Sequence, residues 1–247
     1  GTPLKTHRNF MNVHTRILGF LFICLLFPIS LTAQMKVKKV DVSGLERTKE
    51  SYLRQFIDIE AGQIWRPDQL EKDLQRVKNL FVVADAQAKV DTIEDEVSVS
   101  IQVEEALTLF PIVNFGGVRG NFWFQLGLTD VNFLGKGRQL TTIYRLNDLR
   151  NNYNLYLRSP FLNGTRWGFS AGFQRFASVE PLFFGDQSVY YIYTNLSALG
   201  TAIYQLDRRQ YIEVGGSFFN EDYLKDDRHV GESTPGPNGL RENTLLF

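Results

Sequence analysis

The sequence predicts an exported protein in which a small α+β domain precedes an antiparallel β-sheet of the membrane-barrel type. Three observations predict this fold class. An apolar run near the start of the chain ends at small residues, as in a secretory signal peptide. Residues 36–106 then mix helical and strand periodicities. From about residue 109 onward, apolar residues alternate with small or polar ones over several strands, which is typical of membrane-spanning barrels.

The apolar run near the start of the chain indicates whether the protein is exported. A short basic lead precedes the apolar residues 17–31, and the small residue Ala33 precedes Gln34. We therefore expect residues 11–33 to be a signal peptide cleaved between Ala33 and Gln34, and residues 1–10 to be an upstream remnant. An uncleaved membrane anchor is the alternative, but the run is short and ends at a small residue. The sequence thus predicts export to a cell envelope.

Composition argues against nucleic-acid binding and against catalysis. Lysine plus arginine equals aspartate plus glutamate at 27 each, so no net positive charge attracts a nucleic acid. The only cysteine, Cys24, lies in the expected signal peptide, and His229 is the single histidine after Ala33. A histidine-based catalytic pair or a His/Cys metal site cannot be assembled from one histidine. We therefore predict no enzyme, no metal and no cofactor, and an envelope lipase is disfavoured.

Residues 35–106 are predicted to form a separate domain with the order β-α-α-β-β. Its first strand alternates valines with polar residues. Thr48 is expected to cap a first helix with its side-chain oxygen, and Pro67 to open a second helix at its first position. Two further alternating strands are expected at residues 82–90 and 97–103, which is enough for a small independent core.

The second half of the chain predicts consecutive antiparallel strands with one apolar face. Successive side chains of a strand point to opposite faces of the sheet. In one such strand the apolar side chains Trp167, Phe169, Ala171 and Phe173 oppose Gly168, Ser170, Gly172 and Gln174. Strands of about ten residues joined by short turns fit a membrane barrel. A soluble sandwich or a lipocalin-like barrel alternates in the same way and is the alternative on this pattern alone.

Several motifs resemble known families when they are taken in order along the chain. The residues that resemble a POTRA domain are Val40, Val42, Gly44 and the helix end Asn79-Leu80-Phe81. Further along, the segments Gly127 to Gly137 (GLTDVNFLGKG) and Ser159 to Trp167 (SPFLNGTRW) are similar to strand and turn segments of the BamA/TamA family of outer-membrane proteins. The resemblance covers the chain from about Lys36 onward.

The resemblance implies a fold and a topology. Residues 35–106 would be an α+β POTRA domain, and residues 107–247 the N-terminal part of an antiparallel transmembrane β-barrel, with seven to eight strands present. A sheet of this size would leave an unsatisfied edge in lipid, so we expect the chain to be a fragment of a longer product. External loops are expected at residues 116–121, 147–151 and 176–187, and periplasmic turns at residues 132–137, 160–164 and 206–209.

The resemblance also implies a function. The protein would lie in the outer membrane of a Gram-negative-type bacterium, with the POTRA domain in the periplasm, and would assist outer-membrane protein assembly, insertion or protein translocation. Its partners would be unfolded outer-membrane or secreted proteins, outer-membrane lipids and accessory envelope lipoproteins, with no nucleic acid. The alternative is a passive porin or surface-binding barrel, although such a barrel would not need a POTRA domain.

The resemblance further implies that the candidate functional sites are two backbone edges. The POTRA edge strand could bind extended client segments through main-chain hydrogen bonds; its residues are Val82, Val83, Ala84, Asp85, Ala86, Gln87, Ala88, Lys89 and Val90. The first barrel strand could open and template a client strand; its residues are Leu109, Phe110, Pro111, Ile112, Val113, Asn114 and Phe115.

Each of these edges has a simpler interpretation. Pro111 lacks a ladder donor and is tolerated mainly at sheet edges, but it could instead end a linker that leaves the POTRA domain. The POTRA edge could be merely solvated, with Asp85 and Lys89 as guards against pairing.

Overall fold

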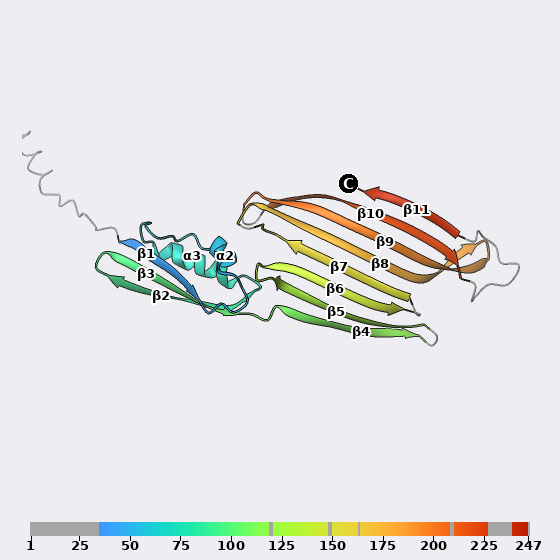
Figure 1. Cartoon of the computed structure of the whole chain (residues 1–247), viewed down its shortest axis with the longest axis horizontal. Helices are drawn as coiled ribbons and strands as arrows, with labels where there is room; N and C mark the ends of the chain where they lie inside the picture. The colour runs from blue at the N-terminus through green and yellow to red at the C-terminus, as the bar shows by residue number, and fades with distance from the viewer. Residues whose placement is uncertain are drawn as a thin grey trace, which may run out of the picture.

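The structure, a computed structural model, describes residues 35–118, 121–147, 150–162, 164–207, 210–226 and 239–246. The predicted signal peptide and its cleavage site at Ala33 and Gln34 lie outside the described residues. Two parts follow each other along the long axis of the molecule, a small α+β domain and a larger sheet (Figure 1).

The small domain contains a three-stranded sheet with the order β1-β3-β2. Strand β3 (Glu96–Glu105) lies in the centre, parallel to β1 (Lys36–Ser43) and antiparallel to β2 (Val83–Ile93). The side chains of β3 that face the helices are among the most buried in the domain: Val97, Val99, Ile101 and Val103. Strict alternation along this strand therefore sets the core, as the sequence predicted.

Three short helical segments cover one face of this sheet: α2 (Glu50–Leu53), the 3-10 helix η1 (Arg54–Phe56) and α3 (Pro67–Lys78). Pro67 occupies the first turn of α3, as predicted. The predicted cap at Thr48 is wrong: α2 begins after Lys49 and has no side-chain cap. Thr48 instead accepts a hydrogen bond from Asn132 of the larger sheet. Among the described residues, no helix combines the length and apolar character needed to cross a bilayer.

A buried carboxylate joins α3 to the loop that precedes it. Asp73 is fully buried, and its Oδ2 accepts hydrogen bonds from the main-chain N–H groups of Asp58 at 2.8 Å and Ile59 at 2.9 Å. Its Oδ1 accepts from the amide of Gln69 at 2.8 Å and lies 3.0 Å from Nη1 of Arg76. Both oxygens of a buried charge are thus satisfied, which offsets the cost of removing it from water.

The larger sheet consists of eight strands, each antiparallel to its neighbour in the chain. They are β4 (Leu109–Val118), β5 (Asn121–Phe133), β6 (Arg138–Asn147), β7 (Arg150–Ser159), β8 (Trp167–Phe184), β9 (Gln187–Gln205), β10 (Tyr211–Lys225) and β11 (Gly239–Leu246). Over the described residues these strands form one continuous sheet and not two packed sheets, so the sandwich alternative is wrong.

Two predicted external loops differ from the structure. In the loop expected at residues 116–121, residues 116–118 and 121 are paired strand of β4 and β5. The external loop expected at residues 176–187 is paired strand, because β8 and β9 form a hairpin of 18 and 19 residues that turns only at Gly185. Ala177, Val189 and Tyr191 are all buried in the outer part of this hairpin. Burial of these side chains stabilises pairing beyond the roughly ten residues that a membrane crossing requires.

We predict that Asp73→Ala destabilises the small domain by about 3 kcal/mol, because the buried N–H of Ile59 and the partly buried N–H of Asp58 lose their acceptor. Asp68→Ala is the matched control on the same helix, since Asp68 makes only a solvent-exposed ion pair with Lys72, which contributes little to stability. Amide hydrogen exchange of β3 in the full chain measures the difference. Equal exchange in the two variants would show that Asp73 does not hold the domain together.

Candidate functional sites at two sheet edges

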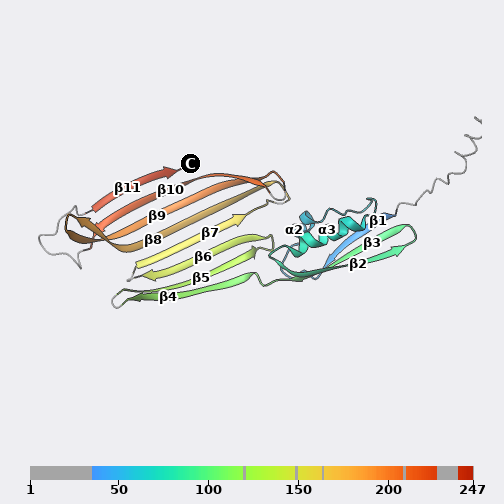
Figure 2. The same ribbon diagram turned by 180° about the vertical axis from the view of Figure 1, so that it is seen from behind.

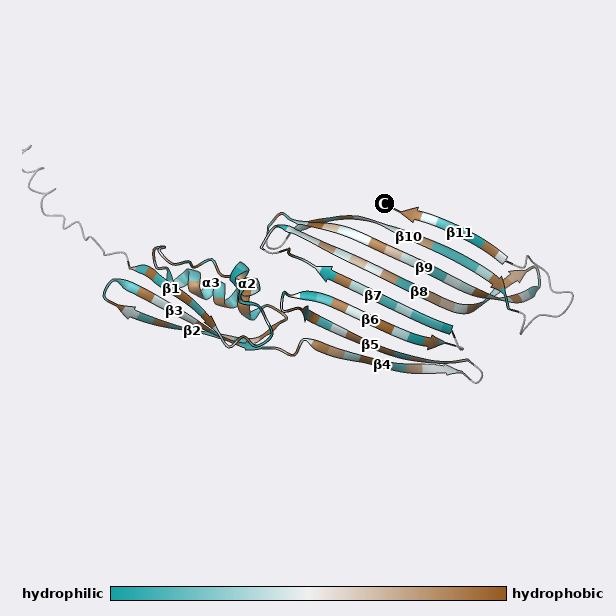
Figure 3. Cartoon of the chain, viewed as in Figure 1, coloured by the Kyte–Doolittle hydropathy of each residue, from teal (hydrophilic) through white to brown (hydrophobic). Residues whose placement is uncertain are grey.

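The two faces of the larger sheet differ in chemistry. Strand register aligns one cross-strand row of side chains on the outer face: Pro111, Leu128, Thr142, Leu155, Phe173, Ala198, Phe218 and Leu245. Most large side chains of this row are exposed, with Leu155 at 49% and Leu245 at 57%. Apolar and polar residues alternate along the strands, as the colouring in Figure 3 shows. An exposed apolar face of this extent fits contact with lipid.

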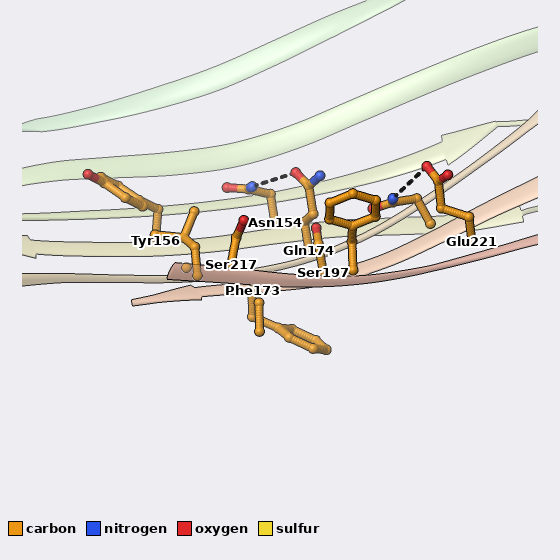
Figure 4. Close-up of a pocket in the computed structure, with 12 residues that line it drawn as sticks. Asn154, Tyr156, Phe173, Gln174, Ser197, Ser217 and Glu221 are labelled. Carbon is orange, nitrogen blue, oxygen red and sulfur yellow. Dashed lines mark hydrogen bonds between the residues drawn. The ribbon is translucent and has the colours of Figure 1, made fainter. Parts of the chain in front are cut away.

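The opposite, inner face is polar. A hollow of about 320 Å³ on this face is lined by Asn154, Tyr156, Gln174, Ser197, Ser217 and Glu221, among others. Figure 4 shows Tyr156, Asn154 and Gln174 on one side of the sheet and Phe173 pointing away from them. Phe173 belongs to the outer row and its chain neighbour Gln174 to the inner face, so the close-up shows side chains on both faces of the sheet.

Charged residues on the inner face form pairs that the sequence did not indicate. Arg158 donates two hydrogen bonds to the carboxylate of Glu213, at 2.9 Å and 3.0 Å. The hydroxyl of Thr201 donates to the same carboxylate at 2.8 Å. These residues come from β7, β9 and β10, and only the pairing register brings them together. Sequence alternation could assign them to the inner face but not to one another.

The first candidate site, the POTRA edge strand, corresponds to β2. Strand β2 lies at the edge of the small sheet and pairs with β3 alone among the described strands. The strand begins at Val83, one residue after the predicted start, although the carbonyl of Val82 still accepts from Ala106 N–H at 3.0 Å. A bulge lies between Val83 and Asp85. Most of the strand therefore presents one unpaired row of main-chain groups.

The predicted guard residues of β2 are held by neighbours. Asp85 lies 2.9 Å from Nζ of Lys78 at the end of α3, and Lys89 lies 3.4 Å from Asp91. The hydrogen bond from Lys78, together with one from Gln87, lowers the pKa of Asp85 to about 2. Asp85 is thus ionised at any physiological pH and is drawn toward α3.

The second candidate site, the first barrel strand, corresponds to β4. Strand β4 is the terminal strand of the larger sheet and pairs with β5 alone among the described strands. Pro111 lies within β4, opposite Leu128, so the linker alternative for Pro111 is wrong. Asn114 lies opposite Gln125, and Phe115 opposite Phe124. A proline in a strand that pairs on one side only is consistent with its missing N–H.

The two edges lie on the same border of the molecule. Strands β2 and β4 follow each other along the lower margin in Figure 1 and again in the reverse view of Figure 2. Strand β3 and a short linker connect them, because β3 ends at Glu105 and β4 begins at Leu109. The structure therefore brings the two predicted sites into one line along the molecule.

Comparisons with known proteins agree with this architecture. Residues 35–106 match the POTRA family model, described as surface antigen variable number repeat. The chain is similar to the crystal structure of BamA from Haemophilus ducreyi lacking POTRA domains 1–3, with 16% identity, a TM-score of 0.61, and coverage of 85% of this chain and 42% of that chain. A search of curated proteins by sequence finds no match.

Weaker similarity extends to CdiB. CdiB from Acinetobacter baumannii is 11% identical with a TM-score of 0.45, over 87% of this chain and 40% of that chain. CdiB from Escherichia coli is 10% identical with a TM-score of 0.46, over 86% of this chain and 38% of that chain.

The fold and the family match define a class of protein, in which a POTRA domain leads into an antiparallel sheet of the barrel type. Within that class the fold is BamA-like, because the POTRA domain and eight-stranded sheet together match part of that structure. The chain spans less than half the length of the BamA chain, 42%.

We predict that Lys78→Ala raises the pKa of Asp85 from about 2 toward its ordinary value of 3.8, because the strongest hydrogen bond to the carboxylate is lost. Lys72→Ala, which removes the partner of Asp68 on the same helix, should leave the pKa of Asp85 unchanged. Carboxyl carbon NMR shifts followed against pH measure both values. An unchanged pKa in Lys78→Ala would show that Asp85 is not held toward α3.

Proposed function

We propose that this protein takes part in outer-membrane protein assembly or in protein translocation across the outer membrane. In this proposal residues 107–247 belong to a barrel in the outer membrane, and the POTRA domain lies in the periplasm. Unfolded outer-membrane or secreted proteins are the clients, outer-membrane lipids surround the sheet, and accessory envelope lipoproteins are further partners. The proposal gives the protein no catalytic role and no cofactor.

The alignment of β2 and β4 is the observation that carries this proposal. An extended client segment can add to an open sheet edge through main-chain hydrogen bonds, which depend little on client sequence. Strand β2 would receive such a segment in the periplasm. Strand β4, which follows the end of β3 at Glu105 after a linker of three residues, would then template a client strand at the membrane. Similarity to the BamA structure supports the arrangement of POTRA domain and sheet on which this proposal rests, and it identifies no client.

The polar inner face supports an alternative proposal, a passive porin or surface-binding barrel. Such a protein needs the apolar outer face and the polar inner face but makes no use of the edge of β2. Client contact at that edge therefore separates the two proposals.

Site-specific photo-crosslinking tests the client contact. Gln87 on β2 and Gln102 on β3 lie opposite each other in register and are both exposed, but only Gln87 is on the edge strand. A photoreactive residue at position 87 should capture an unfolded outer-membrane protein in much higher yield than one at position 102. Equal or absent capture at the two positions would contradict the assembly role and favour the passive barrel.

Two substitutions on β7 test which face of the larger sheet contacts lipid. Leu155 and Asn154 are neighbours on β7 that face opposite sides of the sheet. Leu155→Arg should destabilise the protein in lipid vesicles by about 2–4 kcal/mol, whereas Asn154→Arg should cost about 1 kcal/mol or less. Urea unfolding in vesicles measures both. If Asn154→Arg proved the more costly, the assignment of the lipid-facing side would be reversed.

A further inference from the structure

The turn between β5 and β6 contacts the POTRA domain through a buried hydrogen bond. Asn132 is 3% exposed and Thr48 is 6% exposed, and Nδ2 of Asn132 donates to Oγ1 of Thr48 at 2.8 Å. The two residues are 84 positions apart in the chain. A buried amide–hydroxyl pair of this kind is costly to break, because each group would lose its partner away from water.

Asn132 also shapes the turn itself. Its side-chain Oδ1 accepts from the N–H of Gly137 at 2.9 Å, and its main-chain carbonyl accepts from the N–H of Gly135 at 2.7 Å. One residue therefore fixes the turn conformation and joins the turn to the neighbouring domain. The turn residues 132–137 are called the POTRA seat below.

Two glycines of the POTRA seat leave no room for a side chain. Gly135 has φ +71°, and a Cβ atom there would lie 2.2 Å from the carbonyl oxygen of Arg47. Gly137 has φ +60°, and a Cβ atom there would lie 2.1 Å from the ring of Tyr52. The carbonyl of Gly135 also accepts from Lys49 N–H at 2.8 Å. The main chains of the two domains are thus in direct contact.

Gly164, in the turn between β7 and β8, gives the comparison. It has a similar left-handed conformation, with φ +74°, but a Cβ atom there would have no neighbour within 4 Å. Left-handed backbone alone explains a glycine in either turn. At Gly135 and Gly137, but not at Gly164, atoms of the POTRA domain also occupy the space that a side chain would need.

The POTRA side of the contact is held in shape by Glu105. Its carboxylate accepts from the N–H groups of Glu46 and Arg47, both at 3.2 Å through Oε1, and of Thr48 at 2.7 Å. Burial by itself raises the pKa of Glu105, but these hydrogen bonds outweigh it and hold the pKa below its ordinary value. Residues 46–48, which contact the POTRA seat, are therefore held by hydrogen bonds to the last residue of β3.

Aromatic and ionic contacts extend the same interface. Arg47 lies 3.9 Å from Asp130 of β5. Phe56 of η1 meets Phe161 of the next turn edge-to-face, with 6.0 Å between ring centroids. Burial raises the pKa of Tyr52 to about 12, in keeping with its position against Gly137.

We propose that the POTRA seat is a docking site for the POTRA domain of the same chain, and that it holds the domain in one orientation relative to the larger sheet. The seat keeps the edges of β2 and β4 in line. This inference concerns domain orientation and does not depend on the proposed function.

Distance measurements between spin labels test the docking site in the full chain. Cysteines introduced at the exposed positions Lys89 and Gln139, in a Cys24→Ser background, report on the two domains. The parent protein should give one narrow distance. Gly135→Ala and Gly137→Ala should lose that single distance and give a broad distribution, whereas the matched control Gly164→Ala should keep it.

Thr48→Val provides a second variant that introduces no backbone strain. It removes the hydroxyl partner of Asn132 at nearly constant volume and should also broaden the distance distribution. The proposal is overturned if Gly137→Ala and Thr48→Val both keep the narrow distance. It is equally overturned if Gly164→Ala broadens the distribution as much as Gly135→Ala, because strain in any turn would then be the cause.

Discussion

Main-chain hydrogen bonding between neighbouring strands is the constraint on which this structure depends. In the larger sheet each strand pairs with the next strand in the chain, so turns set the register and the register sets every cross-strand contact. Pairing on both sides satisfies the backbone of the inner strands. Over the described residues, β2 and β4 pair on one side only, so the open groups lie where the proposed function needs them.

The same register separates the two faces of the larger sheet. One cross-strand row places Leu128, Leu155 and Phe173 together on the outer side, while the adjacent row places Asn154, Gln174 and Ser197 on the inner side. A shift of one residue in a single hairpin would exchange these faces. The apolar character of the outer face and the polar character of the inner face therefore both depend on the positions of the turns.

Alternation and turn residues were enough to predict most strands and the order β-α-α-β-β, because these features depend on local sequence. The two edges were predicted from the family resemblance. Prediction failed where a contact joins distant residues. Thr48 was expected to cap α2, but its hydroxyl oxygen accepts a hydrogen bond from Asn132 instead. Residues 176–187 were expected to be a loop, but buried Tyr191 extends the hairpin. Likewise, the glycines of the POTRA seat could be assigned to a turn but not to a domain contact.

Amide hydrogen exchange with and without an unfolded outer-membrane protein tests the central claim most directly, because it observes the main-chain groups themselves. The account predicts that the client adds protection to amides of β2 and β4 and leaves the central strand β3 unchanged. Protection that appears on β1 instead, or no new protection on either β2 or β4, would contradict it.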